Sequence, residues 1–194
     1  MRSPAEVIHR YLMAKDGNRP HLMAGAFSVD ATLAMRVNTS GIAFPPLSSG
    51  RDAIADVLVR RFGQSYENVY TFCLAAPPAQ AVSAFSCAWL VAMTDKAGGN
   101  VRVGCGRYDW RFEAGTGLAE QLAISVEMMQ ILPPAALEPV MRWAASLPYP
   151  WCATATAVSR AGGVVGVAPV LDWLRVAESR EAQLIQGVTS IDAA

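Results

Sequence analysis

The chain has 194 residues, 53% of them hydrophobic and 16% charged, and its 16 basic and 16 acidic residues leave a formal net charge of zero. This length suits one domain with an appendage. The balanced charge, with no basic stripe, argues against nucleic acid as a partner. No apolar run reaches about 18 residues, which argues against a membrane span. The excess of apolar residues must be hidden in a core, a pocket or a subunit interface, and it favours an oligomer.

The first third of the sequence predicts mainly helices. Residues 3–6 (Ser-Pro-Ala-Glu) have the pattern of a capping box with proline at the first helical position, so a helix is expected over residues 4–15. A short second helix should begin near Pro20 and be followed by a strand over residues 31–37. Apolar residues at helical spacing predict a third helix over residues 51–62.

The middle of the sequence changes to β-rich runs separated by turn signals. The runs cover residues 69–74, 82–94, 101–113 and 118–131. Consecutive strands joined by short turns form an antiparallel meander. Strands this long must twist and curl, which gives the sheet a hollow side that the N-terminal helices can close. Helices on one face of an antiparallel sheet define the α+β class.

The remaining residues predict a C-terminal extension. Its expected parts are a helix over 135–146, an extended aromatic segment over 147–152, a small-residue linker over 153–166 and a helix over 169–186. We expect the last helix to be a packing arm, against a partner subunit for instance, with a loose tail as the alternative. The sequence therefore divides into a domain over residues 1–132 and an extension over residues 133–194.

Cysteines and histidines give no sign of a metal or a reactive thiol. The four cysteines have no Cys-x-x-Cys spacing, and His9 and His21 are far from them in sequence. We expect buried thiols in a reducing compartment and no metal or other cofactor. The N-terminus has no apolar run behind its first charges, so no signal peptide is expected and the predicted location is cytoplasmic.

Four segments resemble parts of a known superfamily. Residues 5–12, 26–33 (with Phe-x-x-Asp-Ala), 49–54 (with Gly-x-x-Ala-Ile) and 106–112 are similar to the first helix, the start of the first strand, the third helix and the penultimate strand of the nuclear transport factor 2-like superfamily. Its enzymes include ketosteroid isomerase, scytalone dehydratase, limonene epoxide hydrolase and the polyketide cyclases related to SnoaL. The resemblance covers residues 4–132. It implies a cystatin-like cone, with N-terminal helices packed in the concave side of a curved antiparallel sheet and extra C-terminal helices outside it.

The resemblance implies a role for Tyr11. In ketosteroid isomerase the tyrosine at the matching point of the first helix donates a hydrogen bond to a developing oxyanion. The base of that enzyme lies on the first strand, where this chain has Ala34-Met35-Arg36 and no carboxylate. The alternative is a core tyrosine with its hydroxyl at the pocket wall.

A second candidate set comes from the resemblance to limonene epoxide hydrolase, which has a similar Arg-x-Asp on the penultimate strand. Arg107 and Asp109 match that motif, Glu127 lies near the matching acid of the last strand, and Asn38 matches an asparagine. Such a set could hold a water between a carboxylate base and an amide while a second acid protonates the leaving oxygen. Arg36 stands where that enzyme has a tyrosine.

Whether Arg107, Asp109 and Glu127 have a catalytic or a structural role depends on which face of the sheet packs against the helices. Residues two apart in a strand share a face, so Tyr108 and Trp110 share one face and Arg107 and Asp109 the other. If the aromatic face meets the helices, the charged residues and Glu127 form salt bridges on the outer face or at a dimer contact, each of small stabilising effect.

We therefore expect an apolar, aromatic pocket. The side chains predicted to line it are those of Phe27, Met35, Phe62, Trp89, Tyr108 and Trp110. The expected function is a small-molecule-binding domain of the SnoaL-like type that acts on a small apolar molecule, with cofactor-free hydrolase or isomerase/lyase chemistry if it is an enzyme. The alternative is a non-catalytic homodimeric binding or assembly module with a filled pocket. In either case the chain is expected to form a homodimer through its sheet.

Overall fold

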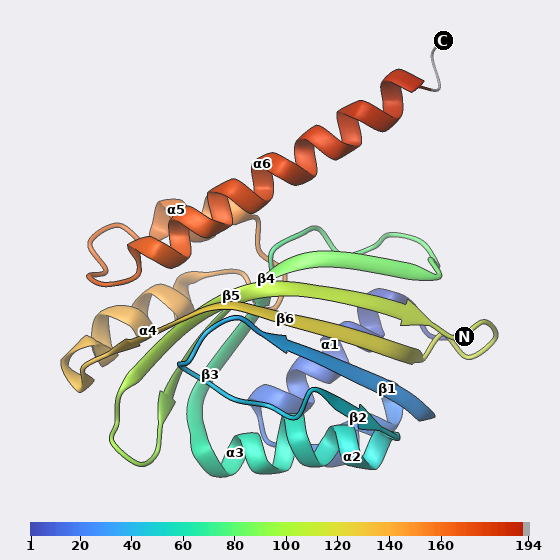
Figure 1. Ribbon diagram of the computed structural model, residues 1–194, viewed down its shortest axis with the longest axis horizontal. Coiled ribbons are helices and arrows are strands. Elements are labelled where there is room, and N and C mark those ends of the chain that lie inside the picture. Colours follow the sequence, from blue (N-terminus) through green and yellow to red (C-terminus); the bar gives the residue numbers. More distant parts are fainter. Residues whose placement is uncertain (192–194) are drawn as a thin grey trace.

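One mixed sheet of six strands forms the centre of the molecule. The computed structural model describes the backbone of residues 1–191 and the side chains of residues 1–180, so the last three residues of the expected extension lie outside the described residues. The strands are β1 (Phe27–Val37), β2 (Leu47–Ser49), β3 (Tyr66–Cys73), β4 (Ala84–Asp95), β5 (Val101–Phe112) and β6 (Ala119–Leu132). Their order is β2-β1-β6-β5-β4-β3 (Figure 1). Strands β3 to β6 form the predicted antiparallel meander, whereas β1 runs parallel to β6.

The first helix, α1 (Pro4–Asp16), begins where the sequence predicts. The Ser3 hydroxyl accepts a hydrogen bond from the Glu6 backbone N–H at 3.3 Å, and the Glu6 carboxylate accepts one from the Ser3 backbone N–H at 2.9 Å. This reciprocal pair satisfies two of the N–H groups at the start of the helix. The hydrogen bond from the Ser3 backbone also holds the pKa of Glu6 below its usual value.

The concave side of the sheet is closed by α1 and a second group of helices. That group contains the 3₁₀ helix η1 (Pro20–Gly25), α2 (Arg51–Ala55), the π-helical turn η2 (Asp56–Arg61) and α3 (Phe62–Ser65). The expected third helix is therefore longer than predicted. Strand β1 begins at Phe27, four residues before the predicted start of the strand at residue 31. Figure 1 shows these helices on one side of the sheet, as the α+β prediction requires.

The sheet bends where β5 passes β6. The register of this pair shifts between Cys105 and Gly106, which leaves Glu127 at a β-bulge. A Cβ at Gly106 would lie 1.8 Å from the carbonyl oxygen of Ser125, so only glycine permits this approach. The bend helps to make one side of the sheet concave.

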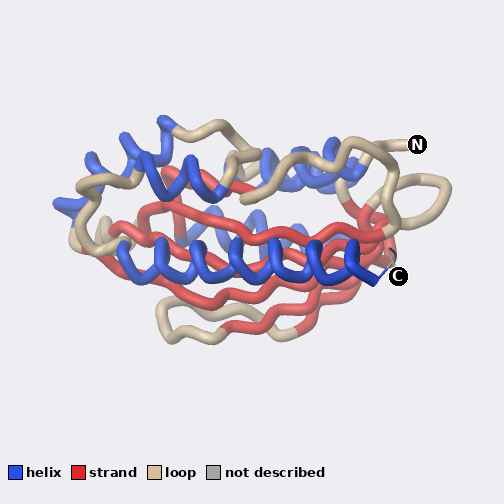
Figure 2. The backbone as a smooth tube through the Cα atoms, turned by 90° about the horizontal axis from the view of Figure 1, so that it is seen from above, coloured by secondary structure: helices blue, strands red, loops and turns tan. Residues whose placement is uncertain are grey.

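The outer face of the sheet is partly covered by the C-terminal extension (Figure 2). This extension contains η3 (Pro134–Ala136), α4 (Leu137–Ser146), α5 (Thr154–Arg160) and α6 (Ala168–Ile191). The prediction of a plain linker over 153–166 is wrong, because α5 lies within it. The described side chains of α6 include Val170, Leu171 and Leu174, which are buried in a second apolar core against β4 and β5. This part of α6 therefore packs on its own sheet.

Candidate functional site

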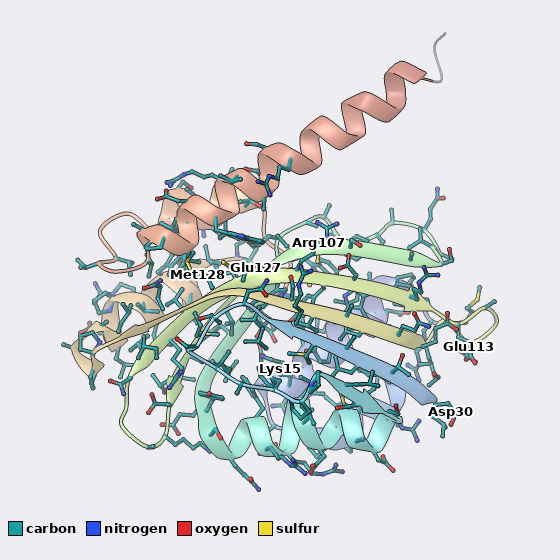
Figure 3. All side chains as sticks on the ribbon, viewed as in Figure 1. Lys15, Asp30, Arg107, Glu113, Glu127 and Met128 are labelled. Carbon is teal, nitrogen blue, oxygen red and sulfur yellow. The ribbon has the colours of Figure 1, made fainter. Side chains whose placement is uncertain are left out.

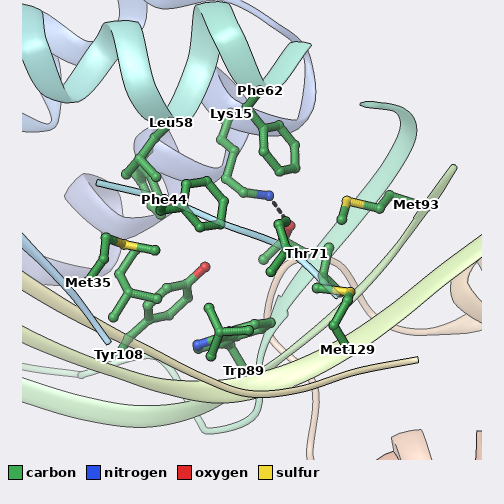
Figure 4. A pocket seen from close by; sticks show the side chains of 15 residues that line it. Lys15, Met35, Phe44, Leu58, Phe62, Thr71, Trp89, Met93, Tyr108 and Met129 are labelled. Atoms are coloured by element: carbon green, nitrogen blue, oxygen red, sulfur yellow. Dashed lines mark hydrogen bonds between the residues drawn. The ribbon is translucent and has the colours of Figure 1, made fainter. Parts of the chain in front are cut away.

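A cavity lies between α1 and the concave face of the sheet. It offers about 40 Å³ of space to the centres of water-sized molecules. One water needs about 10–15 Å³ by this measure, and an engineered cavity of about 150 Å³ binds benzene in another protein. The walls are Tyr11, Lys15, Met35, Ile42, Phe44, Leu58, Phe62, Thr71, Trp89, Val91, Met93, Tyr108, Ile124, Val126 and Met129 (Figure 4). The cavity thus suits a molecule of few heavy atoms.

Tyr11 brings a buried hydroxyl to this cavity. Its side chain is fully buried, and its ring packs edge-on against Phe27, Tyr108 and Trp110. Within the part of the chain whose side chains are described, its hydroxyl has no hydrogen-bond partner of good geometry, although the phenol of Tyr108 is a neighbour. Burial raises the pKa of Tyr11, so the phenol keeps its proton and can donate.

Trp89 and Tyr108 form the floor of the cavity. Their rings are stacked with centroids 5.7 Å apart. The indole Nε1 of Trp89 is buried and also has no hydrogen-bond partner among the described residues. Burial raises the pKa of Tyr108 as well. Both rings therefore carry a donor group, within a wall that is almost entirely apolar.

Lys15 is the one charged side chain among the cavity's described walls. Only 7% of the residue is exposed. Its ammonium donates to Thr71 Oγ1 at 2.8 Å, pairs with Asp16 Oδ1 at 3.2 Å and lies 4.3 Å from the centroid of the Phe62 ring. Burial lowers the pKa of Lys15, and the Asp16 carboxylate opposes that shift.

Asp16 is held by three further donors. The Thr71 backbone N–H donates to Oδ2 at 2.7 Å, the Thr71 hydroxyl to Oδ1 at 2.8 Å, and the Tyr149 hydroxyl to Oδ2 at 3.1 Å. These bonds fix the carboxylate beside Lys15 and satisfy its buried oxygens. Asp16 itself is not among the lining residues.

Sequence reasoning missed Lys15, although a signal was present. Ile8, Tyr11, Leu12 and Lys15 recur at three- and four-residue spacing, and in a helix this spacing places them on one face. A lysine on the apolar face of the first helix is therefore directed toward the core.

Of the predicted lining residues, Met35, Phe62, Trp89 and Tyr108 are among the cavity walls. Phe27 and Trp110 are buried beside Tyr11, with ring centroids 5.8 and 5.4 Å from its ring, but they are not among the lining residues. The structure therefore brings four of the six together with Tyr11 and places the other two beside the cavity in the core.

The predicted acid–base residues of β5 are on the side of the sheet away from the cavity, and Arg107 is labelled in Figure 3. Arg107 and Asp109 form an ion pair at 3.1 Å with side chains 42% and 52% exposed, and the Ser86 hydroxyl donates to Asp109 at 2.6 Å. Their neighbours Tyr108 and Trp110 are buried on the concave side. The strand thus has the outward orientation that was the structural alternative.

Glu127 and Asn38 meet at the β-bulge. The Asn38 amide donates to Glu127 Oε2 at 2.7 Å, and Arg36 lies 3.4 Å from Oε1. Partial burial acts to raise the pKa of Glu127, but hydrogen bonds from Asn38, Ser125 and Arg36 outweigh it and hold the pKa below its usual value. Because Arg36 is 74% exposed on the outer face, this cluster is separated from the cavity by the sheet.

No group of three or more His, Cys, Asp or Glu side chains among the described residues is arranged to hold a metal ion. No helix in the same part of the chain has the length and apolarity that crossing a membrane would need. All four cysteines are free and buried, as expected.

Comparisons with known proteins find likeness at the level of structure. No family model matches the sequence, and no curated protein matches it. A nuclear transport factor 2-like superfamily protein from Salmonella enterica is 21% identical, with a TM-score of 0.51 over 64% of this chain and 88% of that one. A putative isomerase from Rhodopseudomonas palustris is 11% identical, with a TM-score of 0.54 over 66% and 93%. A nuclear transport factor 2-like protein from Burkholderia thailandensis is 17% identical, with a TM-score of 0.51 over 65% and 92%. At these identities the likeness concerns the fold alone.

Proposed function

We propose that this chain, which has the cone-shaped fold of the nuclear transport factor 2-like superfamily, binds a small, largely apolar molecule that carries a hydrogen-bond acceptor such as a carbonyl oxygen. The observation that carries the proposal is the hydroxyl of Tyr11, which is buried at the cavity without a partner among the described residues. An unpaired buried donor costs about 1–3 kcal/mol, and a ligand acceptor would remove that cost.

The polar atoms of the cavity select for acceptors. Tyr11 and Trp89, which both line the cavity, each have a buried donor without a partner among the described residues, and the ammonium of the lining residue Lys15 is hydrogen-bonded to Thr71. No carboxylate is among the described lining residues. A ligand that brings one oxygen acceptor and otherwise hydrocarbon therefore matches this wall better than a cation or a pure donor.

The volume of the cavity limits the size of the ligand, but flexible side chains in the wall allow the cavity to widen. Three methionines, Met35, Met93 and Met129, form part of the wall. Methionine side chains are flexible and repack readily. Phe44, from the irregular segment between β1 and β2, is only partly buried and closes another part. Ligands of about four to six heavy atoms should enter with local side-chain movement.

If chemistry occurs in the cavity, isomerase or lyase chemistry without a cofactor suits it best. A phenol with a raised pKa can stabilise an oxyanion that develops on a carbonyl. The hydrolase-type set of Arg107, Asp109, Glu127 and Asn38 could act only on a molecule bound to the outer face, because the sheet lies between these residues and the cavity.

The second candidate function is that of a homodimeric assembly module with a filled pocket. The small cavity volume favours it. The outer face near Arg107 and Asp109 also stays exposed beside the C-terminal helices, and we propose it as the surface for a homodimer through the sheet. The free buried cysteines suit a cytoplasmic location for either candidate.

The test compares 2-butanone with its hydrocarbon isostere 2-methyl-1-butene by NMR titration of the whole chain. We expect the ketone to bind more tightly, and Tyr11→Phe to weaken ketone binding about tenfold, as the loss of one hydrogen bond predicts, while leaving the hydrocarbon unchanged. Asp109→Asn is the matched control on the outer face and should change neither. Binding of neither compound would favour the assembly module. Ketone binding that is insensitive to Tyr11→Phe would refute the role of the phenol.

A further inference from the structure

Lys15 carries a primary amine, a nucleophile that the non-covalent binding proposed above does not use. We propose that its amine forms an imine with the carbonyl carbon of a small aldehyde or ketone in the cavity, an inference that rests on the proposed function and narrows its ligand class. Lys15 lines the cavity, as does Thr71, to which its ammonium is hydrogen-bonded, and it follows Tyr11 by four residues on the same helix face. One turn of helix thus presents a phenol for the carbonyl oxygen and an amine for the carbonyl carbon.

The surroundings of Lys15 provide a route for its proton. Its Nζ donates to Thr71 Oγ1 at 2.8 Å, and the Thr71 hydroxyl donates to Asp16 Oδ1 at 2.8 Å. A proton can therefore pass from the ammonium through the hydroxyl to the carboxylate, leaving the neutral amine that attacks carbonyls. Figure 4 shows Lys15 directed toward Thr71 at the cavity wall. Burial, which lowers the pKa of Lys15, acts in the same direction.

The reaction balances without a further reactant. The neutral amine attacks the carbonyl carbon, a C–N bond forms, and the carbonyl electron pair moves to the oxygen, which Tyr11 stabilises by donating a hydrogen bond. The oxygen then leaves as water, taking one proton from the nitrogen and the one that Asp16 had received. The product is a protonated imine, so the net change is ammonium plus carbonyl to iminium plus water. Asp16 ends the reaction as a carboxylate beside the cationic iminium, as it began beside the ammonium.

The sequence supplies an internal control for this proposal. The chain has two lysines, Lys15 and Lys96. Lys96 is exposed and donates to the Gly63 carbonyl at 2.7 Å. Non-specific modification follows exposure and would favour Lys96 and the N-terminal amine. Preferential modification of the buried lysine therefore requires binding in the cavity.

The experiment treats the whole chain with butanal and sodium cyanoborohydride, which reduces an imine to a stable butylamine, and maps the products by mass spectrometry. We expect Lys15 to be butylated at least about tenfold faster than Lys96, because a bound carbonyl has a high effective concentration at the amine. Saturating 2-butanol, which can occupy the cavity but has no carbonyl, should slow labelling of Lys15 and leave Lys96 unaffected. Lys15→Arg keeps the cation and should lose only the labelling at position 15.

The outcomes separate the two proposals. If 2-butanone binds as described for the proposed function but Lys15 is labelled no faster than Lys96, the imine proposal is wrong and the binding function stands. If neither binding nor selective labelling occurs, both are wrong. Selective labelling in the wild-type chain supports the imine whether or not Lys15→Arg folds, because the comparison with Lys96 is made within one molecule.

Discussion

Replacement of Tyr11 by phenylalanine should stabilise the ligand-free protein. The substitution deletes one oxygen atom from a fully buried ring that packs against Phe27, Tyr108 and Trp110. In most proteins the loss of a buried tyrosine hydroxyl costs stability, because a hydrogen bond is lost with it. Here the hydroxyl has no partner of good geometry among the described residues.

The magnitude follows from that missing partner. A buried, unsatisfied donor costs about 1–3 kcal/mol, and the oxygen leaves only a small void next to an existing cavity. We therefore expect Tyr11→Phe to raise the free energy of unfolding by about 1 kcal/mol, which corresponds to an increase in Tm of roughly 2–4 °C for a chain of this length. Urea denaturation followed by circular dichroism gives the free energy, and calorimetry gives the Tm.

Tyr149→Phe is the matched control. Its hydroxyl donates to Asp16 at 3.1 Å, and the residue is 39% exposed. Loss of that bond should lower the free energy of unfolding by about 1 kcal/mol, so the same chemical change has opposite signs at the two positions. A loss of about 1 kcal/mol or more at Tyr11 would show that its hydroxyl is already satisfied, by Tyr108 for example, and the case for a ligand acceptor would fail.

Three further predictions concern the sheet and its outer layer. Gly106→Ala should lower the free energy of unfolding, measured by urea denaturation, by about 3 kcal/mol or more, because the new Cβ would overlap the Ser125 carbonyl. Gly162→Ala is the control: a Cβ there would lie 3.8 Å from its nearest neighbour, so the free energy of unfolding should change by less than about 1 kcal/mol. Leu174→Ala should cost about 2–5 kcal/mol in the same assay, and a loss below 1 kcal/mol would contradict the packing of α6 on the sheet. Burial raises the pKa of Cys105 to about 12, so between pH 9 and 12 the unfolded thiol loses its proton while the folded one keeps it, and stability falls with rising pH. Between these pH values Cys105→Ala should reduce the fall in the free energy of unfolding by about 1.4 kcal/mol per pH unit. An unchanged pH dependence would show that the thiol ionises equally in the folded and unfolded states.

The sequence predicted most of the concave half of the molecule. Its capping box set the start of α1, and turn signals at glycine and proline pairs separated the strands of the meander. Both are local signals, determined by the residues at the turn or cap itself. The parallel pairing of β1 with β6 brings together strands almost ninety positions apart, such as Leu33 with Leu122, and no local pattern encodes it.

The site could be predicted only in part, because period-two alternation gives two faces without saying which is inside. The burial of Tyr108 and Trp110 decides this on β5 and places Arg107 and Asp109 outside. The choice depends on the helices that pack against each face. A β-bulge at Glu127 also shifts the alternation of β6 by one residue, which a strict count along the sequence misses.

The chain is rich in apolar residues because both faces of the sheet bury side chains against helices. Alternate residues of β4 enter opposite cores: Trp89 and Val91 face α1 and the cavity, whereas Leu90 and Ala92 face the C-terminal helices. A strand buried on both faces loses its polar alternation and becomes a continuous apolar run, as β4 does over residues 87–93. The extension therefore accounts for apolar surface that would otherwise favour an oligomer. It also restricts the proposed homodimer to the exposed outer surface around Arg107 and Asp109, because the chain's own helices already cover β3, β4 and the first half of β5.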